Sequence, residues 1–291
     1  MTSRLPSLLT TWDFRPEVML VLALSGLFFV SGWLRLQRRG RLRLASGWRL
    51  ISYLSGLIVL SLALLSAIDV FGQRLFFMHM IQHALMIMIA PPLLLLANPF
   101  PFMVWGVPGA RRVSAWLLGR AAPFRNVLCL STRPAIVGLA FVTVLWGWHD
   151  PNAYNTALRL RWVHDLEHLT FFGTALLLWW HAIGAGPRLH PRASTMMRIV
   201  GLLATAGANM IPGVVIALAP TPLYTYYVEA PRTWGLTVMQ DQVLSGLIMW
   251  IPGTMMYLSA AVILILRMLA RSETGLKYHS SQPAPLPARA G

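Results

Sequence analysis

Five histidines are spaced so that they could hold a metal ion. His79 and His83 are four residues apart, as are His164 and His168, and His149 ends an apolar run. Residues four apart lie on one face of a helix, with Cβ atoms about 6 Å apart, so each pair can point at a common centre. We therefore predict a metal site formed by these five imidazoles.

Two further sets of side chains extend this prediction. Met86 follows His83 by three residues, which continues the same helical stripe and adds a thioether, a ligand that favours copper(I). A ligating imidazole usually needs an acceptor for its second nitrogen. Acidic residues close to the histidines are the candidates for that role: Asp69, Asp150, Asp165, Glu167 and Asp241. Imidazole suits copper, zinc and iron, so the residues alone leave the metal open.

The composition indicates an integral membrane protein. Of the 291 residues, 56% are hydrophobic and 11% are charged, whereas about a quarter of a soluble domain is charged. The apolar blocks are long enough to cross a hydrocarbon core about 30 Å thick. We predict an all-α, polytopic fold with seven transmembrane helices at about 17–34, 49–68, 75–97, 134–149, 162–185, 197–218 and 240–267. Residues 1–271 form a single domain, and the polar, proline-rich tail 272–291 is predicted to be disordered.

Arginines predict the orientation of these helices. The net charge is +15, and most arginines lie in the connections after the first, third, fifth and seventh segments. Cytoplasmic loops carry such an excess, so we expect the N-terminus outside and the C-terminus in the cytoplasm. The same distribution argues against nucleic-acid binding. All five histidines then fall near the extracytoplasmic boundary, whereas His181 falls near the opposite one and is interpreted as structural.

Four sequence blocks resemble the seven-helix CtaG-type cytochrome c oxidase assembly factors. They are FFMHMIQHALMIMIAPPLLLLANP (76–99), WGWHDPNAYNTAL (146–158), VHDLEHLTFFGTALLLWWHAI (163–183) and DQVLSGLIMWIPG (241–253). The resemblance implies a multi-pass protein of the bacterial inner membrane that helps to mature haem–copper oxidase without being an enzyme. It also implies copper as the cargo and a cytochrome c oxidase subunit or another copper protein as the partner. The oligomeric state stays open.

Other functions compete with copper delivery. A haem-binding redox protein could use histidines as axial ligands, but bis-histidine haem takes one from each of two helices, not two from one face. A membrane enzyme could use a zinc or iron centre made of histidines and carboxylates, although no nucleophile or substrate-binding motif is recognisable. An ion transporter would need ionisable groups across the membrane, whereas the deeper halves of the segments are almost wholly apolar.

Overall fold

The fold of the protein is all-helical. The computed structural model describes residues 12–119, 122–187, 189–191, 193–231 and 234–280, and within these ranges there is no strand. The helices are α2 Pro16–Arg38, α3 Gly47–Leu65, α4 Ala67–Gly72, α5 Phe76–Ala84, the π-helix η1 Leu85–Ile89, α6 Ala90–Leu96, α7 Pro99–Gly106, α8 Ala110–Leu118, α9 Arg125–Ser131, α10 Pro134–Trp148, α11 Pro151–Arg159, α12 Arg161–Ile183, α13 Thr195–Leu218, α14 Thr225–Glu229 and α15 Val238–Ser280.

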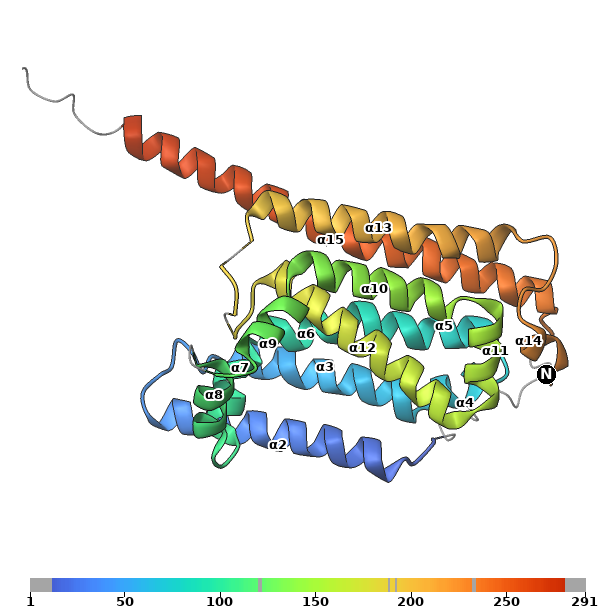
Figure 1. The fold of residues 1–291 in the computed structure, drawn as a ribbon, viewed down its shortest axis with the longest axis horizontal. Coiled ribbons are helices and arrows are strands. Elements are labelled where there is room, and N and C mark those ends of the chain that lie inside the picture. Colours follow the sequence, from blue (N-terminus) through green and yellow to red (C-terminus); the bar gives the residue numbers. More distant parts are fainter. Residues whose placement is uncertain (1–11, 120–121, 188, 192, 232–233, 281–291) are drawn as a thin grey trace, which may run out of the picture.

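The long helices lie side by side in a bundle with two different ends (Figure 1). The short helices α4, α11 and α14 gather at one end, here called the histidine end because α5 and α12 begin there. The short helices α7, α8 and α9 lie at the other, here called the arginine end, which carries Arg38, Arg111 and Arg125. The chain therefore separates the five imidazoles of the predicted site from many of its guanidinium groups along the length of the bundle.

Each of the seven predicted segments is mainly helical, but fewer helices qualify as spans by length and composition. In the described part of the chain, five helices are long and apolar enough to cross a membrane. A sixth arises if α9 and α10, bent by 59°, count as one span. Helix α12 is long enough, but its histidines and acidic residues lower its hydropathy. The structure thus supports five or six spans where the sequence predicted seven.

Helix α15 extends past the residue at which the tail was predicted to begin. The disordered tail was expected to start at residue 272, but α15 continues to Ser280. Apolar residues run without a break from residue 260 to 266, and no proline or glycine follows until Gly275, so nothing local ends the helix at 271. Residues 281–291 lie outside the described residues.

Tryptophans bond the carbonyl groups that prolines leave without a partner. Pro91 has no N–H for the carbonyl of Ile87, and the indole N–H of Trp179 on α12 donates to that oxygen instead, at 2.9 Å. Pro212 likewise has no N–H for the carbonyl of Ala208, and the indole N–H of Trp146 on α10 donates to that oxygen at 2.9 Å. The first bond ties α12 to η1 in the interior, and the second ties α10 to α13 on the exposed side of the bundle.

The segment α5–η1–α6 is the centre of the packing. It contributes Met80, Ile87 and Met88 to the larger apolar cluster, which also includes side chains from α10 to α15. It contributes Met86 and Leu94 to a second cluster, made with α2, α3 and α7. The π-turn η1 contains side chains of both clusters. In it the Ala90 N–H bonds to the carbonyl five residues back, so the helix is wider here.

Candidate metal centre

Two histidines on α5 meet at their ring edges. His79 and His83 are 1% and 4% exposed, and their Nε2 atoms lie 2.8 Å apart. The four-residue spacing places them one turn apart on the same face, as the sequence predicted. Such a short separation requires at least one of the two nitrogens to lack a proton, so at least one ring offers a lone pair.

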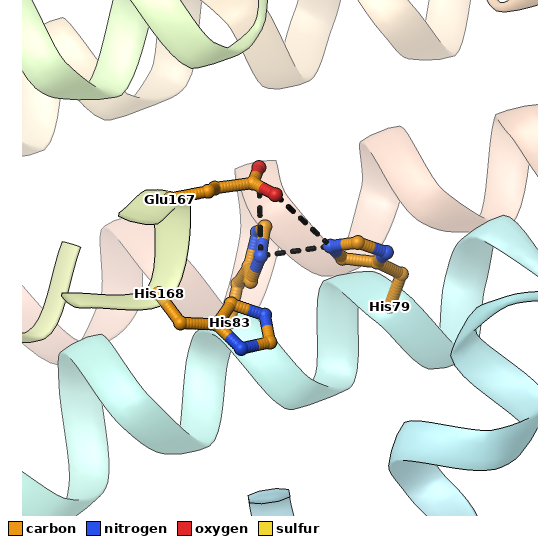
Figure 2. A group of neighbouring side chains, drawn as sticks. All are labelled: His79, His83, Glu167 and His168. Carbon is orange, nitrogen blue, oxygen red and sulfur yellow. Dashed lines mark hydrogen bonds and ion pairs between the residues drawn. The ribbon is translucent and has the colours of Figure 1, made fainter. Parts of the chain in front are cut away.

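Helix α12 adds a carboxylate and a third imidazole. Glu167 is fully buried, and its two oxygens lie 3.9 Å from Nε2 of His79 and 3.8 Å from Nε2 of His83 (Figure 2). His168, the next residue, is also buried. One ligand atom from each of His79, His83, Glu167 and His168 lies within 4.8 Å of the others. We call these four residues the His/Glu group.

The His/Glu group contains polar atoms with no hydrogen-bond partner among the described residues. They are both oxygens of Glu167, both ring nitrogens of His168 and Nδ1 of His83. Buried polar atoms are nearly always paired, so such a concentration requires an explanation. Protein ligands about 2.0–2.2 Å from a metal lie at most about 4.4 Å apart, so only a small closure of the group would bring all four onto one ion.

Tyr227 sets the tautomer of His79. Its hydroxyl donates to the carbonyl of Gly72 at 2.8 Å, and its oxygen lies 3.2 Å from Nδ1 of His79. Since the single phenol proton is used on Gly72, Nδ1 of His79 must donate to Tyr227, which leaves Nε2 as a lone pair. Burial raises the pKa of Tyr227, which keeps this phenol protonated. Nε2 of His79 therefore carries the lone pair that a metal ion would need.

The other two predicted histidines flank the group on different sides. His164 is half-buried, and its ring centroid lies 4.0 Å from that of His168 and 5.2 Å from that of His79. His149 donates from Nδ1 to the carbonyl of Leu145 at 2.6 Å, and its buried Nε2 has no partner in the described part of the chain. His149 is outside the four-residue group and lines a small cavity beside His83.

Met86 is not on the side of the helix where that cavity lies. It is 1% exposed and packs in the second apolar cluster with side chains such as Tyr53 and Leu60. The sequence prediction assumed regular α-helical geometry, but the π-turn begins at Leu85 and changes the direction of the following side chains. Met80 and Met88 line the cavity with His83 and His149 instead.

Four of the five acidic residues predicted to support the imidazoles bind other groups. Asp69 accepts from Gln82 (2.6 Å), Asp150 from the backbone of Asn152 (3.0 Å), Asp165 from Arg15 (2.6 Å), and Asp241 from the backbone of Phe76 (3.0 Å) and Phe77 (2.9 Å). The fifth, Glu167, lies inside the group rather than behind it. These carboxylates were chosen because they are close to the histidines in the sequence, but that closeness does not predict which hydrogen-bond donor each one contacts.

Asp69 positions the ligand helix indirectly. Gln82 on α5 donates to Asp69 on α4 and, at 2.9 Å, to the carbonyl of Ala63 on α3. Burial raises the pKa of Asp69 to about 6, and the hydrogen bond from Gln82 partly offsets this effect. Because Gln82 precedes His83, this contact fixes α5 against α3 and α4.

Sequence reasoning missed the roles of two residues. Glu167 was assigned to support a ligand, although its position three residues after His164 places it on the same side of the helix as that histidine. Tyr227 was not considered, because it lies 148 residues from His79 and no local pattern connects them. The first role had a signal in the spacing, whereas the second depends on the tertiary fold.

Comparison with known proteins places the chain in a family. A model of the cytochrome c oxidase caa3 assembly factor family matches residues 27–271. Uncharacterized proteins of Mycobacterium bovis and Mycobacterium tuberculosis are each 26% identical over 255 residues, and one of Mycobacterium leprae is 23% identical over 254. These matches cover 83% of this chain but only 37% of each relative. No solved structure matches. The chain belongs to the cytochrome c oxidase caa3 assembly factor family.

Proposed function

We propose that this protein binds copper at the His/Glu group and delivers it during assembly of haem–copper cytochrome c oxidase. Family membership supports the process, and the buried donors support the chemistry. The observation that carries the proposal is Glu167, whose buried oxygens lie beside two imidazoles without a hydrogen-bond partner in the described part of the chain. A buried carboxylate is costly unless a cation or hydrogen bonds compensate it, and a bound metal ion would do so.

The donor set fits a transition metal carried as cargo. Imidazole binds copper, zinc and iron, and a carboxylate adds negative charge. His79 and His83 would hold the ion from α5, and Glu167 and His168 from α12. Copper is the cargo that a haem–copper oxidase needs, so we propose copper, and zinc is the alternative that the same donors would accept.

Haem fits this site less well than a single ion. The cavity beside His83 and His149 has a volume of about 20 Å³, which is far too small for a porphyrin. In addition, His79 and His83 share one helix face, with their Nε2 atoms 2.8 Å apart, so they cannot act as axial ligands on opposite faces of one haem.

His164 supports a route for transfer. Its half-buried ring packs at 4.0 Å against that of His168, so it connects the buried donors to the surface. We propose that copper passes through His164 to a cytochrome c oxidase subunit or another copper protein. Exchange of one imidazole for another would let the ion move without leaving its ligands entirely.

The proposed topology places this exchange outside the cytoplasm. We propose that α10 and α12 cross the bacterial inner membrane in addition to the five apolar helices, which gives seven spans in one domain. The arginine end would then face the cytoplasm by the positive-inside rule, with the N-terminus outside and the C-terminus inside. The His/Glu group would lie near the outer boundary.

A complementation experiment tests this function. Cells that lack the gene would receive the wild type, a His79→Ala/His83→Ala variant, or a His181→Ala variant as a matched control. His181 lies elsewhere on α12, and its Nε2 donates to the carbonyl of Thr132 at 2.8 Å. We expect the double variant to lose copper on purification and to lower oxidase activity in copper-poor medium, with rescue by added copper.

The control variant should keep both properties. Unchanged copper content in the double variant would contradict the site. Normal oxidase activity of cells with the double variant in copper-poor medium would contradict the assembly role.

A further inference from the structure

A small cavity lies on the side of His83 that faces the larger apolar cluster. Its volume is about 20 Å³, and its lining includes His83 and His149 together with the three methionines Met80, Met88 and Met249. We call this space the methionine cavity. A cavity needs about 10–15 Å³ to hold one water-sized particle, so this one has room for a single small guest.

The lining of the methionine cavity is unusual for a water site. A buried water typically makes two to four hydrogen bonds. The polar side chains of this wall are His83, His149 and Asn209, and Asn209 already donates to the carbonyl of Met249, whereas the other six residues are thioether or aliphatic. Thioethers are soft ligands that select copper(I) over harder cations. The wall therefore matches a soft monovalent cation better than it matches a water molecule.

His149 gives the cavity a nitrogen donor. Its Nδ1 donates to the carbonyl of Leu145, so the proton is fixed on that nitrogen. The opposite edge of the ring, Nε2, is a lone pair that is buried without a hydrogen-bond partner in the described ranges. An unpaired acceptor of this kind beside three methionines is a second observation, independent of the thioethers, that indicates a bound cation.

The π-turn η1 brings the methionines together. Each residue of an α-helix advances the side chain by about 100°, and a wider π-turn advances it by less. Met88 is the fourth residue of this turn. Its side chain is therefore rotated back toward the helix face that carries Met80 and His83. Regular α-helical geometry would not align these two methionines as closely.

Gly253 lets the last helix close the cavity. A Cβ atom at this position would lie 2.8 Å from Cε of Met88 and 2.6 Å from Nδ2 of Asn209. Asn209 in turn donates to the carbonyl of Met249 at 2.9 Å, which holds α13 against α15 at the same level. The absence of a side chain at residue 253 therefore allows α15 to place Met249 opposite α5.

We propose that the methionine cavity is a second metal site, which takes one copper(I) ion with Met80, Met88, Met249 and His149 as donors. His83 lines this cavity and also belongs to the His/Glu group, so the two sites are adjacent. The inference rests on the proposed function in that copper is the cargo. It adds a softer position, deeper in the bundle, where copper(I) is held between uptake and release.

The test uses silver(I), a redox-inert probe with the ligand preferences of copper(I), on the purified full-length protein in detergent. The Met80→Leu/Met88→Leu/Met249→Leu variant removes the thioethers, and leucine for methionine nearly conserves volume. We expect this variant to bind one equivalent less than the wild type. Met86→Leu is the matched control, since Met86 is equally buried in the same segment but does not line the cavity. It should bind as the wild type does.

A measurement on the wild type keeps the proposal falsifiable if the triple variant is unstable. With methionine methyl groups labelled by carbon-13, silver(I) should shift the resonances of Met80, Met88 and Met249 and leave that of Met86 in place. Gly253→Ala, which crowds Met88, should weaken silver(I) binding tenfold or more.

Three outcomes would overturn the proposed copper(I) site in the methionine cavity: unchanged silver(I) stoichiometry in the triple variant, no shift of the three methyl resonances, or loss of one silver(I) equivalent in Met86→Leu. A Glu167→Gln/His168→Ala variant separates this inference from the proposed function. It should keep the silver(I) equivalent of the cavity while losing copper from the His/Glu group. If it keeps all its copper instead, the proposed function fails at its site, whatever silver(I) does in the cavity.

Discussion

Tyr227 illustrates how one hydroxyl group can prepare a buried site. It accepts from His79 and donates to Gly72, so the phenol acts as a fixed link between a backbone carbonyl and His79. Metal-binding imidazoles usually bond an acceptor through their second nitrogen, which fixes both the tautomer and the ring orientation. Here the acceptor is a neutral phenol, although the sequence suggested a carboxylate.

Tyr227→Phe should therefore weaken metal binding while the fold persists. Loss of a partner of this kind lowers metal affinity about 10- to 100-fold, and the stability cost of one hydrogen bond is about 1 kcal/mol. Titration of purified protein with copper against a competing chelator measures the first effect. Tyr257→Phe is the control, because the hydroxyl of Tyr257 is buried with no hydrogen-bond partner among the described residues. Equal loss of affinity in both variants would contradict the role of Tyr227.

At the scale of the helix, Asp241 joins elements from opposite parts of the chain. It lies at the start of α15, and its two oxygens accept from the first two N–H groups of α5, those of Phe76 and Phe77. The first N–H groups of a helix have no partner within it, so an acidic side chain stabilises them. Because the carboxylate is 1% exposed, this cap is part of the interior.

Asp241→Ala should destabilise the protein and lower the affinity of the His/Glu group for metal. Two amide groups lose a charged acceptor, and each buried donor left unpaired costs about 1–3 kcal/mol. Asp150→Ala is the matched control, because Asp150 caps α11 locally and is exposed, where a lost cap costs about 1 kcal/mol. Thermal unfolding in detergent compares the two. A drop in the midpoint no larger for Asp241→Ala than for Asp150→Ala would argue against the interior cap.

The sequence predicted the helices well because apolar length and helix starts are local features. The segment at 134–149 matches α10, which begins at Pro134, a residue favoured at the first position of a helix. The π-turn was not predicted, because the sequence pattern assumed a regular helix; it contains Ile87, whose carbonyl accepts from Trp179 on the distant α12. The histidine pairs were found from spacing, but the place of Met86 was not, because that spacing assumed an unbroken α-helix.

At the scale of the whole molecule, the two ends of the bundle differ in charge and chemistry. Arg39 and Arg111 each lie over the ring of Trp105 at the arginine end, at 4.5 and 4.7 Å from its centroid. Stacking of this kind is typical of a membrane interface, where tryptophan is enriched and arginine flanks the helices. The histidine end instead holds the five imidazoles of the predicted site.

Reporter fusions should place these ends on opposite sides of the membrane. A fusion after residue 150 should give an active periplasmic phosphatase and a dark fluorescent protein, and a fusion after residue 115 should give the reverse. The physical reason is the cost of moving clustered arginines across the membrane. The opposite pattern would invert the topology and place the His/Glu group at the cytoplasmic face. Residue 272 is a suitable third fusion point and should report the same side as residue 115.

The bond between Asp241 and α5 also bears on how the protein is made. The ribosome delivers the N-terminal helices first, so α5 enters the membrane long before residue 241 is synthesised. Until α15 arrives, the leading amides of α5 can bond only water or lipid headgroups, and the wall that carries Met249 is missing. The proposed copper sites would then be complete only after α15 has been inserted, so a chain that stops before residue 241 should bind metal poorly.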